Sequence, residues 1–216
     1  MGRMVRGVVV LGSLLWAGGE ALAAPNNFAG GRAGGRQAYV TAGFADVEGG
    51  VFLPVGPVEL KPRFRFGFNP LGRGGLALVP EVGLDVRWQL IDGGDFSGSL
   101  VLGVDVPISI APATGGVAVG FGLGNPGFLM TYRIENVVDL DFGVLVEPTL
   151  VVSGGAVGVQ IDLPLIFGVE FEVTKGIVLG VRAEGGPSLT TGTAFGGTAL
   201  GVGPYVRALV GVSFGF

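Results

Sequence analysis

Residues 199–216 read ALGVGPYVRALVGVSFGF, and their character alternates with a period of two. The odd positions are mostly small or polar and include Arg207. The even positions are apolar throughout: Leu200, Val202, Pro204, Val206, Ala208, Val210, Val212, Phe214 and Phe216. A strand in a soluble protein usually has about 5–6 residues, whereas a tilted strand needs about 9–11 to cross a bilayer. The segment therefore predicts a membrane-crossing β-strand with one lipid face.

The same alternation runs through most of the chain and is clearest in residues 58–68. There Phe64 and Phe66 alternate with Lys61, Arg63 and Arg65. A helix would scatter these charges around its circumference, so the pattern indicates a strand. We expect ten strands over residues 36–47, 58–68, 76–90, 98–110, 117–123, 128–134, 138–152, 157–171, 177–189 and 199–216.

Two places affect this count. Residues 48–57 are rich in glycine and proline and are interpreted as a turn. At residues 124–127, GNPG, the alternation shifts by one residue, which a bulge or a tight turn would each explain. We favour a turn because Asn-Pro-Gly is strong turn chemistry and because it makes the strand number even. Ten strands are expected, with eight as the main alternative and twelve as another.

The N-terminus has the three parts of a secretory signal peptide. Arg3 and Arg6 precede an apolar core at residues 8–16, and Ala21 and Ala23 form a small-x-small cleavage site. The apolar run is far shorter than the ~20 residues of a spanning helix. We therefore expect a signal peptide at 1–23, a flexible N-terminal linker at 24–35 and a single barrel domain at 36–216.

The composition favours a barrel that exposes its apolar face to lipid. Mean hydropathy is +0.65 and only 14% of residues are charged, whereas soluble domains average about 25%. Removing Arg3, Arg6 and Glu20 from the 13 basic and 17 acidic residues leaves 11 and 16, so the exported chain is acidic. An acidic chain argues against nucleic acid as a partner. The chain has no cysteine, so disulfides do not stabilise it.

The charged residues of the strands share one face, which we assign to the interior. A charge facing lipid at the midplane would cost about 2–4 kcal/mol, so this placement is enforced. Arginine dominates the basic set, and its planar fork suits confined ion pairs. The candidate lumen-lining residues are Glu59, Lys61, Arg63, Arg65, Glu81, Asp85, Arg87, Asp105, Asp139, Asp141, Glu147, Asp162, Arg182, Glu184 and Arg207, with Arg133 and Glu170 on the same face. The alternative is a soluble lipocalin-like barrel that binds an apolar ligand inside, but its outer face would then be glycine-rich with very few lysines.

The signal peptide, the alternating strands and the terminal phenylalanine together resemble the small outer-membrane β-barrel proteins of Gram-negative bacteria. Gly211, Phe214 and Phe216 are similar to the C-terminal signal that hands such barrels to their assembly machinery, although Leu209 stands where that signal usually has a polar residue. The resemblance implies an all-β, transmembrane, antiparallel up-and-down barrel in the bacterial outer membrane. Its expected partners are outer-membrane lipid and the barrel assembly machinery.

Enzymatic chemistry is not expected. Small outer-membrane barrels that are enzymes, such as omptin-type proteases, resemble one another in relying on a histidine, and this chain has none. No cofactor or metal site is expected; a carboxylate pair at Asp139 and Asp141 would suit a cation, but pairing with interior arginines is favoured. Two functions remain: a charged, largely filled barrel that forms a narrow pore for ions or small solutes, or a non-conducting structural or interaction barrel that acts through its rim or lipid face.

Overall fold

The computed structural model describes residues 28–31, 34–44, 46–69, 77–111, 116–135 and 137–216. The expected signal peptide at 1–23 lies outside the described residues. No helix among the described residues is long and apolar enough to cross a membrane.

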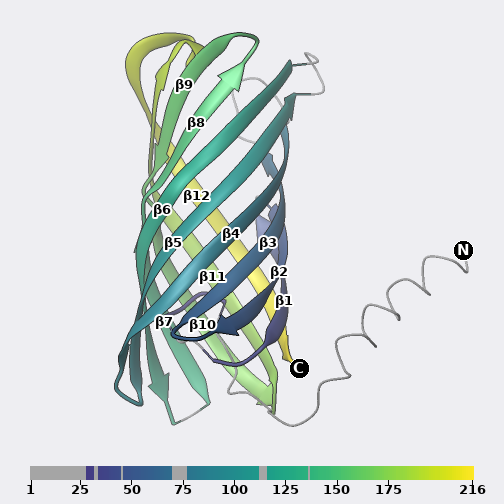
Figure 1. Cartoon of the computed structure of the whole chain (residues 1–216), viewed down its shortest axis with the longest axis vertical. Coiled ribbons are helices and arrows are strands. Elements are labelled where there is room, and N and C mark those ends of the chain that lie inside the picture. Colours follow the sequence, from purple (N-terminus) through teal and green to yellow (C-terminus); the bar gives the residue numbers. More distant parts are fainter. Residues whose placement is uncertain (1–27, 32–33, 45, 70–76, 112–115, 136) are drawn as a thin grey trace, which may run out of the picture.

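The described chain is almost entirely β-strand, wound into one tilted, elongated wall (Figure 1). The elements are β1 (Gln37–Phe44), β2 (Asp46–Val55), β3 (Val58–Asn69), β4 (Ala77–Asp92), β5 (Phe96–Ala111), β6 (Gly116–Ile134), β7 (Val138–Leu145), β8 (Glu147–Ser153), β9 (Ala156–Asp162), β10 (Leu165–Thr174), β11 (Ile177–Gly192), the 3-10 helix η1 (Thr193–Phe195) and β12 (Gly197–Gly215). Every pairing is antiparallel, and β1 closes the sheet on β12 with Gln37 opposite Gly215.

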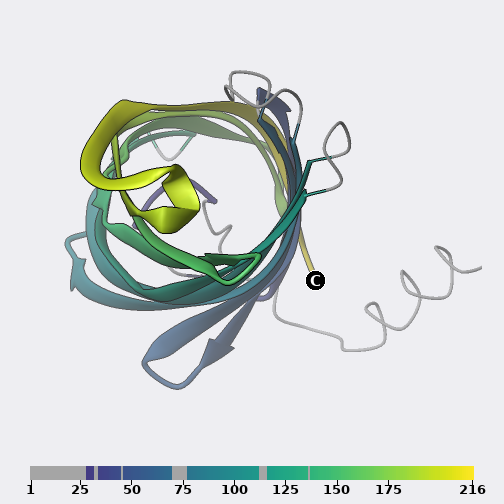
Figure 2. The ribbon, with the colours of Figure 1, turned by 90° about the horizontal axis from the view of Figure 1, so that it is seen from above.

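The twelve labelled strands make ten strands of the wall. Both β7 and β8 pair with β6, and both β9 and β10 pair with β11. Each of these pairs is therefore one wall strand with a short break, at Val146 and at residues 163–164. The view along the barrel axis shows the closed ring (Figure 2). The predicted fold class, an antiparallel up-and-down barrel of ten strands, is confirmed.

The number ten nevertheless conceals two errors that cancel. Residues 48–57, interpreted as a turn, belong mostly to strand β2, and only residues 56–57 turn the chain. The glycines there serve packing: a Cβ atom on Gly50 would lie 2.7 Å from Cε1 of Tyr39. Glu48, next to them, is buried and accepts a hydrogen bond from the Tyr39 hydroxyl at 2.6 Å.

The second error is at residues 124–127, where β6 continues without a turn. The phase shift is a bulge: the register against β5 slips between Val101 and Gly103, and Gly124 and Asn125 take positive φ of 85° and 20°. The Asn125 side chain donates a hydrogen bond to Asp105 in the interior. The turn chemistry of the sequence is thus used to re-aim a strand, which is a common role of bulges.

The outer face is apolar on every side of the barrel. Large hydrophobic side chains at the alternate positions that we assigned outward are exposed, including Phe64, Val104, Phe167 and Val210. A soluble protein rarely exposes apolar surface so continuously. The exterior is therefore that of a barrel embedded in lipid.

The connections define two different ends. The C-terminus and the short turns at 56–57, 93–95, 135–137 and 175–176 lie at the end drawn lowest in Figure 1, which we call the lower end. The upper end carries the β8–β9 turn and η1, which leans over the opening when the barrel is viewed from above (Figure 2). An even number of strands with the C-terminus and turns at one end matches bacterial outer-membrane barrels.

Candidate functional site in the barrel interior

All fifteen candidate lumen-lining residues lie at buried or half-buried positions of the wall strands. They meet one another across strands that are distant in sequence. Their placement defines three levels of the interior: an ion-pair network at mid-height, a bound N-terminal segment below it and a pocket above it.

Arg207 of β12 is the centre of the first half of the network. Its guanidinium contacts three buried carboxylates: Asp46 at 2.6 Å, Glu48 at 2.7 Å and Glu184 at 3.1 Å. Tyr205 also donates a hydrogen bond to Glu184, at 2.9 Å. Because Arg207 uses all three guanidinium nitrogens in this way, it ties β12 to β2 and to β11.

Arg63 of β3 is the centre of the second half. It pairs with Glu81, with Asp85 at 3.1 Å and with Asp105 at 3.4 Å, so it ties β3 to β4 and β5. Lys61 links the two halves, because its Nζ lies 3.2 Å from Glu48 and 3.9 Å from Asp85. The network therefore spans a wide arc of the wall, from β11 through β12, β2 and β3 to β5. Buried charges tolerate such a site only when they are paired.

Residues 28–31, which we call the N-terminal segment, lie inside the lower half of the barrel. Phe28 and Ala29 are fully buried, and the Ala29 amide donates a 2.8 Å hydrogen bond to Glu170. The Gly31 amide donates to Thr131 at 2.9 Å. Arg87 and Arg182 reach in from the wall and donate to the carbonyls of Gly30 and Phe28, at 2.7 and 3.1 Å respectively.

Glycines of the wall make room for this segment. A Cβ atom on Gly180 would lie 2.8 Å from Cζ of Phe28, and one on Gly168 would lie 2.8 Å from Cβ of Ala29. The segment is itself restricted, because a Cβ atom on Gly30 would overlap Asp141 and Thr131. Complementary small residues on both sides indicate a specific seat for the segment.

This arrangement differs from the expected flexible linker at 24–35. The described part of that range, residues 28–31, is held by backbone and side-chain hydrogen bonds inside the barrel. The sequence FAGG has no periodicity, so pattern reasoning assigns it no structure. The available signal was indirect: the interior face of β10, β11 and β12 carries Gly168, Gly180 and Gly211, and empty space there needs an occupant.

Two neighbouring aspartates have different environments. Asp139 forms a two-pronged pair with Arg133, with both nitrogen–oxygen distances 2.6 Å. Asp141 is fully buried and accepts a 2.7 Å hydrogen bond from the Thr131 hydroxyl. Within the described residues, no group of three or more histidine, cysteine or acidic side chains is arranged to hold a metal ion.

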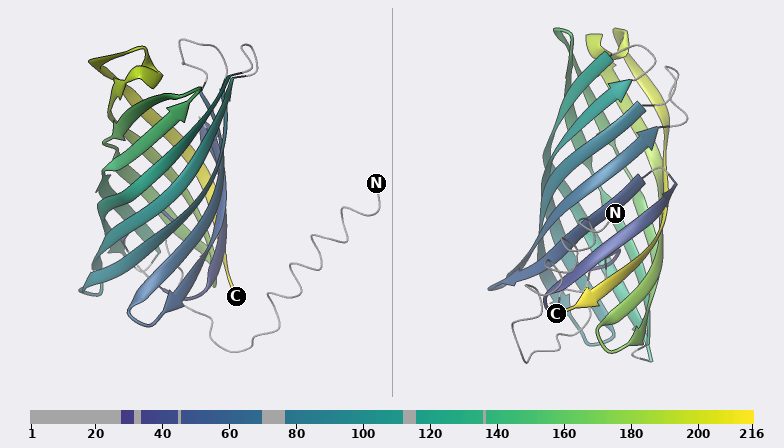
Figure 3. Two further views of the ribbon diagram at one scale, coloured as in Figure 1. Left: turned by 45° about the horizontal axis from the view of Figure 1, so that its top comes forward. Right: turned by 90° about the vertical axis from the view of Figure 1, so that its right-hand side faces the viewer.

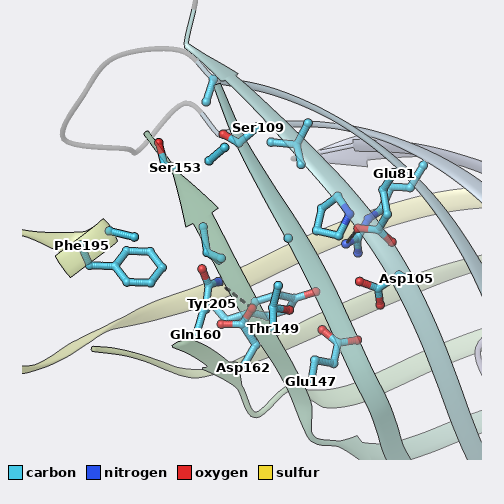
Figure 4. A pocket seen from close by; sticks show the side chains of 18 residues that line it. Glu81, Asp105, Ser109, Glu147, Thr149, Ser153, Gln160, Asp162, Phe195 and Tyr205 are labelled. Atoms are coloured by element: carbon cyan, nitrogen blue, oxygen red, sulfur yellow. Dashed lines mark hydrogen bonds and ion pairs between the residues drawn. The ribbon is translucent and has the colours of Figure 1, made fainter. Parts of the chain in front are cut away.

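The upper half of the barrel contains a pocket of about 390 Å³ beneath η1 (Figure 4). Its upper part is largely apolar and its deeper part is charged or polar. The apolar lining comprises Ala77, Val79, Pro107, Ala118, Val151, Ala194 and Phe195. The charged and larger polar lining comprises Arg65, Glu81, Asp105, Glu147, Thr149, Gln160, Asp162 and Tyr205. A second cavity, of only about 40 Å³, lies among the side chains of the network.

Sequence reasoning missed several of the interior residues. Asp46 and Glu48 were assigned to the end of a strand and to a turn, so they were not included among the candidates. Tyr39 and Tyr205 were not included because only charged side chains were considered. Asp46 and Glu48 stand two residues apart, and this spacing was the signal that could have revealed an interior strand face.

Neither a protein-family model nor a curated protein matches the chain. Among solved structures, the chain is similar to the outer membrane protease OmpT from Escherichia coli, with a TM-score of 0.41 and 8% sequence identity. The match covers 84% of this chain and 94% of OmpT. The likeness is one of barrel fold alone. At the level of architecture, the chain has the form of an outer-membrane β-barrel, as the sequence predicts.

Proposed function

We propose that this protein is an integral barrel of the bacterial outer membrane that is closed to ions and presents a binding pocket at its upper, external end. Of the two functions that the sequence leaves open, the interior favours the non-conducting barrel. The carrying observation is the double closure, by the ion-pair network at mid-height and by the N-terminal segment below it.

The network leaves little space for passage. Arg63 and Arg207 each contact three carboxylates, and the cavity among these side chains is about 40 Å³. One water molecule occupies about 30 Å³ of the liquid. Small barrels are generally filled by side chains in this way, while wide aqueous channels are found in much larger barrels.

The proposal includes no catalytic step. The similar structure is a protease, but the match is weak and this chain has no histidine and no cysteine to serve as base or nucleophile. The pocket residues instead offer hydrogen bonds, a charged floor and an apolar upper wall. We further propose that β12 is the strand that the assembly machinery recognises, through Phe214 and Phe216.

The test is the conductance of refolded, heat-modifiable barrels in a planar bilayer. We expect no discrete current steps from the wild-type chain. Stable single-channel steps from the folded wild type would overturn the proposal and support a pore.

A variant lacking residues 28–31 separates the two closures. Because the network remains, this variant is also expected to be silent, and its permeability to water-sized solutes should rise only slightly. The matched control is Gly203→Ala, since a Cβ atom on Gly203 meets nothing within 4 Å. Large steps from the deletion alone would mean that the segment, and not the network, closes the lumen.

A further inference from the structure

The wall of the barrel is incomplete in its upper half. The β1–β2 hairpin stops early: its last pairs are Phe44 opposite Ala208 of β12 and Asp46 opposite Gly67 of β3. Above them, residues 197–206 of β12 pair with β11 on one edge and, within the described chain, with no strand on the other. The hairpin ends well below the top of the barrel in the right-hand view of Figure 3. We call this opening between β12 and β3 the notch.

The notch is wide and lies at the height of lipid. Two strands are missing between β12 and β3, so these strands are three spacings of about 4.8 Å apart, or about 14 Å. An alkyl chain passes through a gap of that width. Outward side chains along the unpaired edge are apolar and strongly exposed: Leu200 by 66%, Val202 by 71% and Val206 by 52%. These side chains place the edge of the notch against hydrocarbon.

The upper pocket lies directly behind the notch. On one side, its lining comes from β3 and β4, with Arg65 and Val79; on the other side, it comes from Tyr205 of β12. The intervening position on β12 is open, because a Cβ atom on the interior-facing Gly203 would have no atom within 4 Å. The pocket therefore communicates sideways with the position of the outer lipid leaflet.

The floor of the pocket carries excess negative charge. Four acidic residues and one basic residue line it, and the basic one, Arg65, is paired with Glu81. Within the described chain, the Glu147 carboxylate has no hydrogen bond or ion pair, although it points into the pocket (Figure 4). Asp162 accepts a 2.8 Å hydrogen bond from Gln160 but has no cationic partner among the described residues.

We propose that the upper pocket binds a single-chain amphiphile that enters from the membrane through the notch. The cationic head group lies on the floor formed by Glu147, Asp162 and Asp105. The alkyl chain crosses the Gly203 position and leaves through the notch into lipid. Charge complementarity selects the head group, and the apolar rim of the notch accommodates the chain.

The experiment uses dodecyltrimethylammonium with a photoreactive diazirine beside the nitrogen. The probe is added at low mole fraction to phosphatidylcholine vesicles that hold the refolded wild-type barrel, and labelled positions are mapped by mass spectrometry. We expect labels on the pocket floor, at Glu147, Thr149 or Gln160, as well as on lipid-facing residues. A dodecyl sulfate analogue with the same diazirine should label only the lipid-facing residues, which serve as an internal standard.

Gly203→Trp tests the route, because the indole would fill the open space beside the notch. Labelling of the floor should fall by at least about tenfold, while labelling of lipid-facing residues stays unchanged. Gly49→Trp is the matched control: Gly49 lies opposite Val40, and a Cβ atom there meets only ordinary contacts, at 3.6 Å and beyond. Undiminished floor labelling in Gly203→Trp would overturn lateral entry, since the ligand would then arrive through the upper mouth. Equal floor labelling by the cationic and anionic probes would overturn the head-group assignment, and no floor labelling by either would overturn the site.

Discussion

The ring of Phe28 packs over Gly211: a Cβ atom on Gly211 would lie 3.1 Å from Cζ of that ring. Gly211 also matches the C-terminal assembly signal, so the same position has a structural reason to be glycine. Any larger residue there would contact both Phe28 and the Thr41 side chain, at 2.6 Å from its Cγ2. The last strand and the first described segment of the chain are thus packed against each other inside the barrel.

Removing the Phe28 ring should release the N-terminal segment. The chain has no cysteine, so Ala29→Cys provides a single thiol at a position that is 0% exposed. That thiol should react slowly with a water-soluble maleimide. Adding Phe28→Ala should raise its rate by at least about tenfold, equivalent to about 1.4 kcal/mol of easier local opening.

Thr193→Cys at the exposed upper rim is the control, and its labelling rate should not respond to Phe28→Ala. Fast labelling of Ala29→Cys in the otherwise wild-type barrel would contradict the buried position of the segment.

Arg207→Ala should be among the most destabilising substitutions in the chain. It leaves Asp46, Glu48 and Glu184 without their shared cation, and breaking a buried ion pair from one side costs about 3–5 kcal/mol. Arg36→Ala, at an exposed side chain, should change stability by about 0.5 kcal/mol or less. Equilibrium urea unfolding in lipid vesicles measures both, and a similar small loss from the two variants would refute the network's structural role.

The sequence predicts the wall of this barrel better than its contents. Alternation identifies an interior face for Glu59 or Arg63 because a strand has only two faces and lipid rejects charge from one of them. No comparable rule assigns partners, since Arg207 meets Asp46 only after β12 has returned to β1 and β2. Phe28 is harder still, because its seat is formed by residues of several strands and its own segment has no repeat.

The two misassigned turns have one physical origin. Glycine and asparagine favour turns because they tolerate positive φ, and the same property suits a bulge. At Gly124 and Asn125 the chain uses that property inside a strand. At Gly50 the absence of a side chain is used for packing against Tyr39, so composition alone misidentified the segment.

The bulge gives a clean test of backbone strain. A Cβ atom on Gly124 meets nothing within 4 Å, but its φ is +85°. Gly124→Ala should therefore destabilise the barrel by about 1–2 kcal/mol through backbone conformation alone. Gly203→Ala has the same open space without a positive φ, so it should be neutral or slightly stabilising. Equal effects of the two substitutions in urea unfolding would mean that β6 does not hold this conformation in the folded barrel.

The assignment of inside and outside is tested most directly by placing an arginine on each face of β5. Val104 is 53% exposed on the outer face, and arginine there should cost about 2–4 kcal/mol at the bilayer midplane. Ser109 lines the upper pocket, where a guanidinium finds room and acidic neighbours such as Asp105. Val104→Arg should therefore block folding into vesicles, judged by the loss of the heat-modifiable gel shift, while Ser109→Arg should retain it. The reverse outcome would exchange the lipid and interior faces, because both substitutions add the same charge to the same strand and differ only in the face that receives it.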